Sequence, residues 1–95
     1  MIERHITLAV HPGQGAALER FFTDEYRPPM DASPGFLDAW LLRALDSETD
    51  YQIVLRFEDP DAAVAWRTSA VHEALQPGLN ALHGGMTIQP YEVVG

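Results

Sequence analysis

The sequence predicts an α+β sandwich in which helical segments cover one face of a four-stranded antiparallel sheet. Two observations carry this prediction. Apolar residues alternate with a period of two in four segments, and they recur at three- and four-residue spacing in two others. The segments follow one another as strand, helix, strand, strand, helix, strand, which is the split β-α-β order of a ferredoxin-like sandwich. With 95 residues, the chain has room for a single domain over residues 1–95.

The first two elements are a strand and a helix. Even-numbered residues over Ile2–Val10 are apolar apart from Arg4, which predicts a strand with one apolar face. Aliphatic and aromatic residues at helical spacing predict a helix over Gln14–Tyr26. That helix must break at Pro28 and Pro29, because neither residue has an amide hydrogen to donate.

The middle of the chain predicts a β-hairpin. Phe36–Ala44 and Tyr51–Phe57 are mostly apolar, and a polar loop at residues 46–50 separates them. Two such strands joined by a short loop should pair antiparallel.

The last part of the chain predicts helix and then strand. Asp59 suits the N-cap of a second helix. Further helix is expected over Ala70–Leu75, ending before Pro77. Met86–Val94 predicts the fourth strand, and Pro90 within it indicates an edge or irregular position because proline cannot donate to a neighbouring strand.

The second strand is apolar on both faces, which predicts a homodimer. Phe36, Trp40 and Leu42 alternate with Leu37, Ala39 and Leu41. Helices of this chain can cover only one face of the sheet, so something else must cover the other. A second copy of the chain is the economical candidate, because two-fold homodimers are the commonest assembly.

Composition narrows the class of protein. The chain has 14 acidic residues against six arginines and no lysine, for a net charge of −8, which disfavours nucleic acid and anionic membranes as partners. The absence of cysteine and lysine excludes disulfides, thiol catalysis and a Schiff-base lysine. No apolar stretch is long enough for a membrane span and no signal pattern opens the chain, so a cytoplasmic protein is expected.

No motif indicates a metal or a cofactor. The four histidines show no HxH, HExxH or comparable spacing. Gly13-Gln14-Gly15 lacks the third glycine of a dinucleotide-binding loop. We therefore expect neither a metal ion nor a bound cofactor.

Two stretches of the chain resemble a known family. Pro12-Gly13 precedes a helix, and Ser33-Pro34-Gly35-Phe36 opens an apolar strand that ends in Leu41-Leu42-Arg43. Phe57-Glu58-Asp59 is followed by Ala62-Ala63, Trp66 and Ser69-Ala70-Val71-His72. Together, over Ile2–Val94, these residues resemble the antibiotic biosynthesis monooxygenase superfamily, small proteins of the dimeric α/β-barrel type. The resemblance implies that two subunits pack sheet to sheet, and that each keeps a pocket between its helices and its sheet.

The resemblance implies several possible activities. One branch of the family oxidises electron-rich aromatic substrates of the quinol or anthrone type with molecular oxygen and no cofactor. Another branch binds and degrades haem, but the position of its axial histidine falls on Leu75 or Gln76 here, and the first strand lacks the asparagine of that branch. The leading hypothesis is thus a cofactor-independent monooxygenase. The alternatives are a dimeric small-molecule-binding domain without turnover and a haem-binding relative.

Candidate site residues follow from residue type and from the resemblance. His72 is the candidate general base, and Arg56 is the candidate stabiliser of a phenolate, an enolate or superoxide. Arg4 is a second candidate for that role. An ion pair between either arginine and Asp38 is the structural alternative.

The resemblance places Trp66 in the pocket wall, with core packing as its alternative reading. Candidate contacts for a small aromatic ligand are Trp66, Phe22, Tyr26, Trp40 and Asn80.

Overall fold

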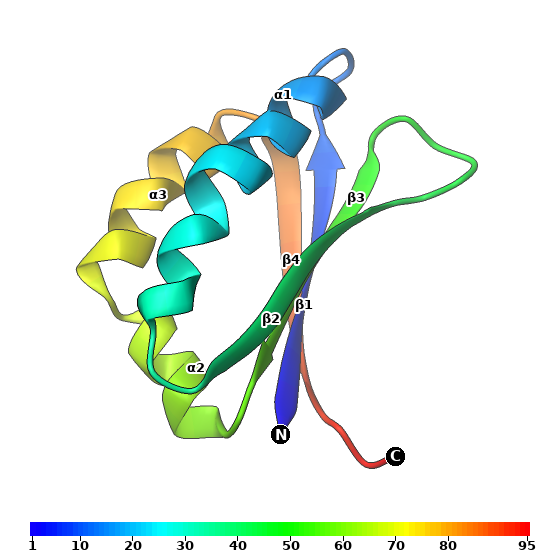
Figure 1. Ribbon diagram of the computed structural model, residues 1–95. Helices are drawn as coiled ribbons and strands as arrows, with labels where there is room; N and C mark the ends of the chain where they lie inside the picture. The colour runs from blue at the N-terminus through cyan, green and yellow to red at the C-terminus, as the bar shows by residue number, and fades with distance from the viewer.

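The computed structural model describes residues 1–95 and contains one open sheet of four strands. The strands are β1 (Ile2–Val10), β2 (Phe36–Arg43), β3 (Asp50–Phe57) and β4 (His83–Glu92). They lie in the order β2-β3-β1-β4, and every neighbouring pair is antiparallel. The predicted ferredoxin-like α+β fold is confirmed, and β2 and β4 are its two edges, so the sheet of this chain does not close into a barrel (Figure 1).

All helical segments lie on one face of the sheet (Figure 1). They are α1 (Gly15–Phe21), the π-helical turn η1 (Phe22–Tyr26), the 3-10 turn η2 (Pro28–Ala32), α2 (Pro60–Arg67) and α3 (Ala70–Asn80). None of these helices is long and apolar enough to cross a membrane. The first helix ends as predicted, because the prolines that follow it can begin only the short turn η2.

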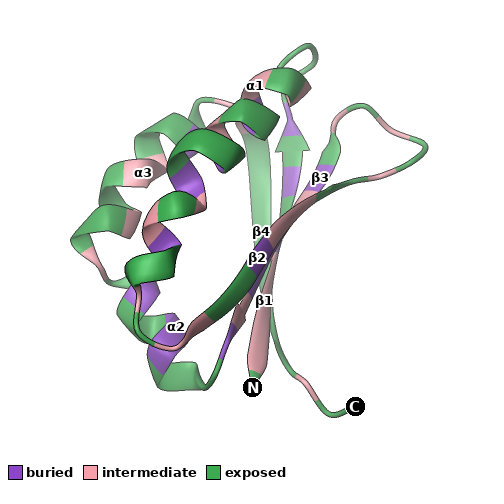
Figure 2. Ribbon diagram, in the orientation of Figure 1, coloured by how far each residue is buried: buried purple, intermediate pink, exposed green.

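The core lies between the sheet and the helices. Its largest fully buried side chains are Trp66, Tyr26, Phe57, Leu8, Leu18, Met30, Ile53, Leu55 and Leu79. No charged or polar residue is fully buried. Buried residues alternate along β1 and occur on the inner sides of the helices, while β4 is exposed along most of its length (Figure 2). The helical layer thus leaves the β4 side of the sheet incompletely covered.

The second strand differs from its predicted alternation. A register shift between Phe36 and Asp38 places Phe36 opposite Phe57, on the helix side with Ala39 and Leu41. The prediction had grouped Phe36 with Trp40 and Leu42. A bulge changes which face a side chain takes, and periodicity alone does not reveal its position.

The third helix is longer than predicted. Asp59 caps α2 through the Ala62 amide at 2.8 Å, as expected, but α3 continues through Pro77 to Asn80. Pro77 removes one backbone donor, yet Leu79 beyond it is only 2% exposed and packs into the core. Burial of that side chain favours continuing the helix, so packing overrides the expected stop.

Candidate functional site

A cleft opens where α2 faces β1 and β4. Its volume is about 490 Å³, and it is lined by Ile2, Arg4, Pro60, Ala63, Val64, Arg67, Ile88 and Pro90. The α2 contribution comes from positions spaced by three and four residues, which lie on one stripe of a helix. The cleft walls are therefore mostly apolar, and Arg4 and Arg67 bring the only charged side chains. We call this site the α2 cleft.

Neither arginine of the α2 cleft has a carboxylate partner. The ion pairs made by arginines involve Arg27, Arg43 and Arg56, with no acidic group within 4.0 Å of Arg4 or Arg67. Arg4 is half-buried on the helix side of β1, whereas Arg67 is exposed at the end of α2. Burial lowers the pKa of Arg4, and the positive charge of Arg67 lowers it further. Two unneutralised guanidinium groups thus share one cleft.

An aromatic cluster adjoins these arginines in the helical layer. The ring centroids of Trp66 and His72 lie 5.5 Å apart in an edge-on arrangement, and those of Tyr26 and Trp66 lie 6.1 Å apart. Trp66 and Tyr26 are both 1% exposed. The indole N–H of Trp66 is near enough to the Tyr26 hydroxyl to affect its pKa, yet it has no partner in hydrogen-bond geometry. We call Tyr26, Trp66 and His72 the aromatic cluster.

His72 lies in the first turn of α3 and is only half-buried. Its backbone N–H donates to the Ser69 hydroxyl at 3.1 Å, which caps the helix. Its ring Nε2 lies 3.2 Å from Gln76 Nε2. With the Gln76 amide in this orientation its nitrogen donates and the ring nitrogen accepts, which assigns the proton of neutral His72 to Nδ1.

The electrostatics of this region keep His72 neutral. Burial lowers the pKa of His72, and the charges of Arg4 and Arg67 lower it further, while the Arg67 backbone carbonyl acts in the opposite direction. Burial also raises the pKa of the Tyr26 phenol, which holds it protonated. Near neutral pH the region therefore offers a neutral imidazole beside fixed positive charge, which is a suitable arrangement for accepting a proton and stabilising the resulting anion.

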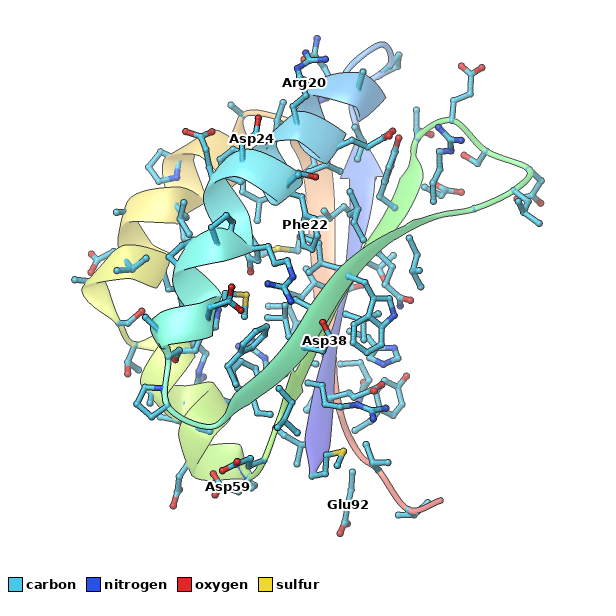
Figure 3. All side chains as sticks on the ribbon, in the orientation of Figure 1. Arg20, Phe22, Asp24, Asp38, Asp59 and Glu92 are labelled. Carbon is cyan, nitrogen blue, oxygen red and sulfur yellow. The ribbon has the colours of Figure 1, made fainter.

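The structure brings together four of the seven candidate site residues. His72, Trp66, Phe22 and Tyr26 lie on the helix side, where Phe22 and Tyr26 stack with centroids 6.0 Å apart. None of the four lines the α2 cleft itself. Phe22 is labelled in Figure 3 on the turn that follows α1. Both residues are buried in the core, so they support the aromatic cluster from behind.

The other three candidates lie elsewhere. Arg56 alternates with the fully buried Leu55 and Phe57, so it points to the opposite face of the sheet from His72. There its Nε donates to Glu3 at 2.8 Å and its guanidinium lies 5.9 Å from the Trp40 ring centroid. The expected joint site of His72 and Arg56 is thus not formed within the chain, because alternation in β3 assigns the arginine to the other face.

Asn80 and Asp38 also take other positions. Asn80 is the exposed last residue of α3 and does not line the α2 cleft. Asp38 stands opposite Arg56 in register, but its carboxylate accepts from Arg27 at 3.3 Å. The anticipated ion pair of Arg56 exists with Glu3 instead of Asp38.

Sequence reasoning missed Arg67. The helical spacing of the residues that line the cleft from α2 could have identified it. This spacing places Arg67 on the same stripe of the helix as Pro60, Ala63 and Val64. Arg4 was found from the sequence because it interrupts the apolar alternation of β1. No group of three or more histidine or acidic side chains is arranged to hold a metal ion.

Comparison with known proteins defines the class. The antibiotic biosynthesis monooxygenase family matches residues 1–78, and the chain belongs to this family. No curated protein shows significant similarity to it. Among solved structures, a point mutant of SnoaB, a cofactor-independent oxygenase from Streptomyces nogalater, superposes with a TM-score of 0.86 at 22% identity, covering 97% of this chain and 91% of SnoaB.

A second solved relative binds a porphyrin. A point mutant of MhuD, with two manganese protoporphyrin IX molecules per active site, superposes with a TM-score of 0.82 at 29% identity over 99% of this chain and 95% of MhuD. Haem iron in proteins is held by histidine, cysteine, methionine or tyrosine. None of these types lines the α2 cleft, so a haem ligand would have to come from His72 or Tyr26 in the adjoining aromatic cluster.

Proposed function

We propose that this chain is a cofactor-independent monooxygenase that oxidises a small electron-rich aromatic, of the quinol or anthrone type, in the α2 cleft. The observation that carries the proposal is an apolar cleft lined by the unpaired Arg4. His72 lies outside the lining, in the adjoining aromatic cluster, where burial and the charges of Arg4 and Arg67 hold it neutral. Family membership supports oxygenase chemistry, and the named activity of SnoaB is of this kind.

The proposed reaction begins with proton transfer to His72. Nε2 accepts a proton from an anthrone methylene or a quinol hydroxyl, and Arg4 stabilises the anion that forms. For an anthrone, the carbanion passes one electron to O2, and the substrate radical and superoxide combine into a peroxide. Loss of water then leaves the quinone carbonyl, so one oxygen atom enters the product and the other leaves as water. Apolar walls favour this sequence because they limit quenching of the anion by solvent.

This assignment revises the sequence hypothesis at one residue. Arg4 takes the anion-stabilising role expected of Arg56, since Arg4 lies on the helix side of the sheet and lines the cleft. His72 keeps the proposed role of base, and Trp66 supports its ring edge-on.

Oxygen uptake tests the proposal. Anthrone and 1,4-naphthohydroquinone are supplied to chelator-treated protein, and uptake is compared with the autoxidation rate. The expected result is protein-dependent uptake that falls at least about 100-fold in His72→Ala and in Arg4→Gln, which is the usual scale for a general base or an anion stabiliser. Arg20→Gln is the control, because Arg20 projects from the outer side of α1 (Figure 3). Uptake that is unchanged in His72→Ala contradicts the proposal.

A binding domain without turnover is the second candidate. It is supported by the Gln76 amide, which occupies the lone pair of His72 that a base requires. Gln76→Ala separates the two candidates: faster oxygen uptake supports catalysis restrained by Gln76. Ligand binding without uptake in both proteins supports the binding domain.

We also propose that the chain functions as a homodimer joined through the sheet face opposite the helices. This face carries Trp40, Leu42, Val54 and Tyr91, which we call the open-face patch. Leu42 is 44% exposed and Tyr91 is 50% exposed, and all the helices of the structure lie on the other face of the sheet (Figure 1). Sheet-to-sheet packing is the arrangement that the family resemblance implies.

A further inference from the structure

The rim of the α2 cleft carries a charge that the proposed reaction does not use. Arg67 is the last residue of α2 and lines the cleft together with Ala63 and Val64. The acidic residues of the same helix region, Asp59 and Asp61, stand at its other end. Although the chain has 14 acidic residues, no carboxylate lies within 4.0 Å of Arg67.

We propose that Arg67 binds the carboxylate of an aromatic monocarboxylic acid whose ring lies against the apolar wall of the α2 cleft. The inference rests on the proposed function for the aromatic nature of the ligand and adds the anionic group. A guanidinium presents paired N–H donors that match the two oxygens of a carboxylate. The apolar wall suited to the ring is formed by Ile2, Val64 and Ile88.

The α2 cleft favours an anion for a second reason. Burial lowers the pKa of Arg4, and repulsion by the positive charge of Arg67 lowers it further. A ligand carboxylate bound to Arg67 offsets the charge that repels Arg4, whereas a neutral ligand leaves this repulsion in place. The division of roles follows burial: Arg67 is exposed and can recognise a carboxylate at the rim, while half-buried Arg4 remains for the reacting end of the ring.

The net charge of −8 favours a monoanion over a dianion. The long-range field of the chain repels every anion, and the penalty doubles for a phosphate dianion compared with a carboxylate. The α2 cleft offsets this field only locally, with two positive charges and no acidic lining residue. A carboxylate therefore suits the site better than a phosphate monoester does.

The test is a calorimetric titration with three naphthalene probes that differ in one substituent. 2-Naphthoate carries the carboxylate, 2-naphthamide is its neutral counterpart of similar shape, and 2-naphthyl phosphate carries the dianion. We expect 2-naphthoate to bind about tenfold more tightly than 2-naphthamide, as one charge-assisted contact allows. We also expect 2-naphthyl phosphate to bind more weakly than 2-naphthoate.

Three variants test whether Arg67 causes the preference for 2-naphthoate over 2-naphthamide. Arg67→Gln should remove the preference for 2-naphthoate, Arg67→Lys should keep part of it, and Arg20→Gln should leave it unchanged while removing the same formal charge. Thermal denaturation of each variant checks the fold, which substitution of an exposed side chain should preserve. Equal affinities for 2-naphthoate and 2-naphthamide overturn the inference, as do an equal loss in Arg20→Gln, tighter binding of the phosphate, or no binding of 2-naphthoate.

The carboxylate inference and the monooxygenase proposal can fail independently of each other. Binding is measured without oxygen or turnover, so a protein that prefers 2-naphthoate through Arg67 but never consumes oxygen contradicts only the monooxygenase. A protein that consumes oxygen with anthrone yet binds 2-naphthoate and 2-naphthamide equally contradicts only the carboxylate inference.

Discussion

At the scale of single residues, the character of the α2 cleft comes from two arginines that no carboxylate neutralises. Arg56, by contrast, is paired with Glu3, whose pKa is lowered by its hydrogen bonds to His5 and to Arg56. The same residue type thus plays a structural role on one face of the sheet and remains free for a ligand on the other. Alternation along β1 and β3 produces this division, because adjacent residues point to opposite faces.

His72 should titrate below its ordinary pKa of 6.5, and Arg67 should contribute to that shift. We expect Arg67→Gln to raise the pKa of His72, since it removes one of the positive charges that lower it, and Arg20→Gln to leave it unchanged. Titration of the His72 ring protons by NMR measures both. If His72 is the base, the acid limb of the oxygen-uptake profile should move to higher pH in Arg67→Gln. An unchanged titration in that variant contradicts this electrostatic account.

The same shift has a consequence for stability. The unfolded chain binds a proton at His72 near pH 6.5, whereas the folded chain binds it only at lower pH. Between the pKa of His72 in the unfolded chain and its lower pKa in the folded chain, the unfolded state holds more protons. The contribution of His72 to stability therefore falls as the pH is lowered through this range. Above pH 6.5 this contribution is fully present.

At the scale of elements, the positions of most strands and helices follow from the periodicity of apolar residues. Where the structure departs from that periodicity, packing between elements is the cause. The bounds of β1 agree with the prediction because alternation is strong there. The extension of α3 beyond Pro77 and the register shift at Phe36 were not predictable, since both depend on contacts with other elements. The α2 cleft could not be predicted from the sequence for a related reason, because Arg4 and Arg67 become neighbours only when α2 packs on the sheet.

Two glycines with positive φ offer a matched test of close packing between elements. Gly13 has φ +82° and a Cβ there would meet nothing within 4 Å, whereas Gly35 has φ +79° and a Cβ would lie 2.5 Å from the Ala62 Cβ. Gly13→Ala should cost about 1 kcal/mol for the left-handed backbone alone. Gly35→Ala should cost roughly a further 1–3 kcal/mol, because the start of α2 must move.

Chemical denaturation of both glycine variants measures the difference. A larger loss for Gly35→Ala indicates that close contact between α2 and the turn before β2 is required. Equal losses would show that α2 shifts freely at its N-terminal end, and would weaken the assignment of a fixed wall to the α2 cleft.

At the scale of the whole molecule, the sheet has one face covered by helices and one face without cover. Val54 is 3% exposed on the uncovered face, and its neighbours in register are His5 and Trp40. This face also holds the ion pair of Glu3 and Arg56. The open-face patch is therefore an apolar surface beside an already neutralised pair, which lowers the electrostatic cost of covering it with another protein surface.

Leu42→Glu should convert the proposed homodimer into a monomer. We expect light scattering to give twice the chain mass of 10.6 kDa for the wild type and the single mass for the variant, because the new glutamate of each copy would lie in an apolar interface without a partner. Val71→Glu is the matched control: Val71 is 46% exposed against 44% for Leu42, but it lies on α3 in the helical layer. A dimer that persists in Leu42→Glu, or one that is lost equally in Val71→Glu, would place the interface elsewhere. If the open face is the interface, the α2 cleft stays accessible in the dimer, because it lies on the helix side of the sheet, and both copies can bind ligand.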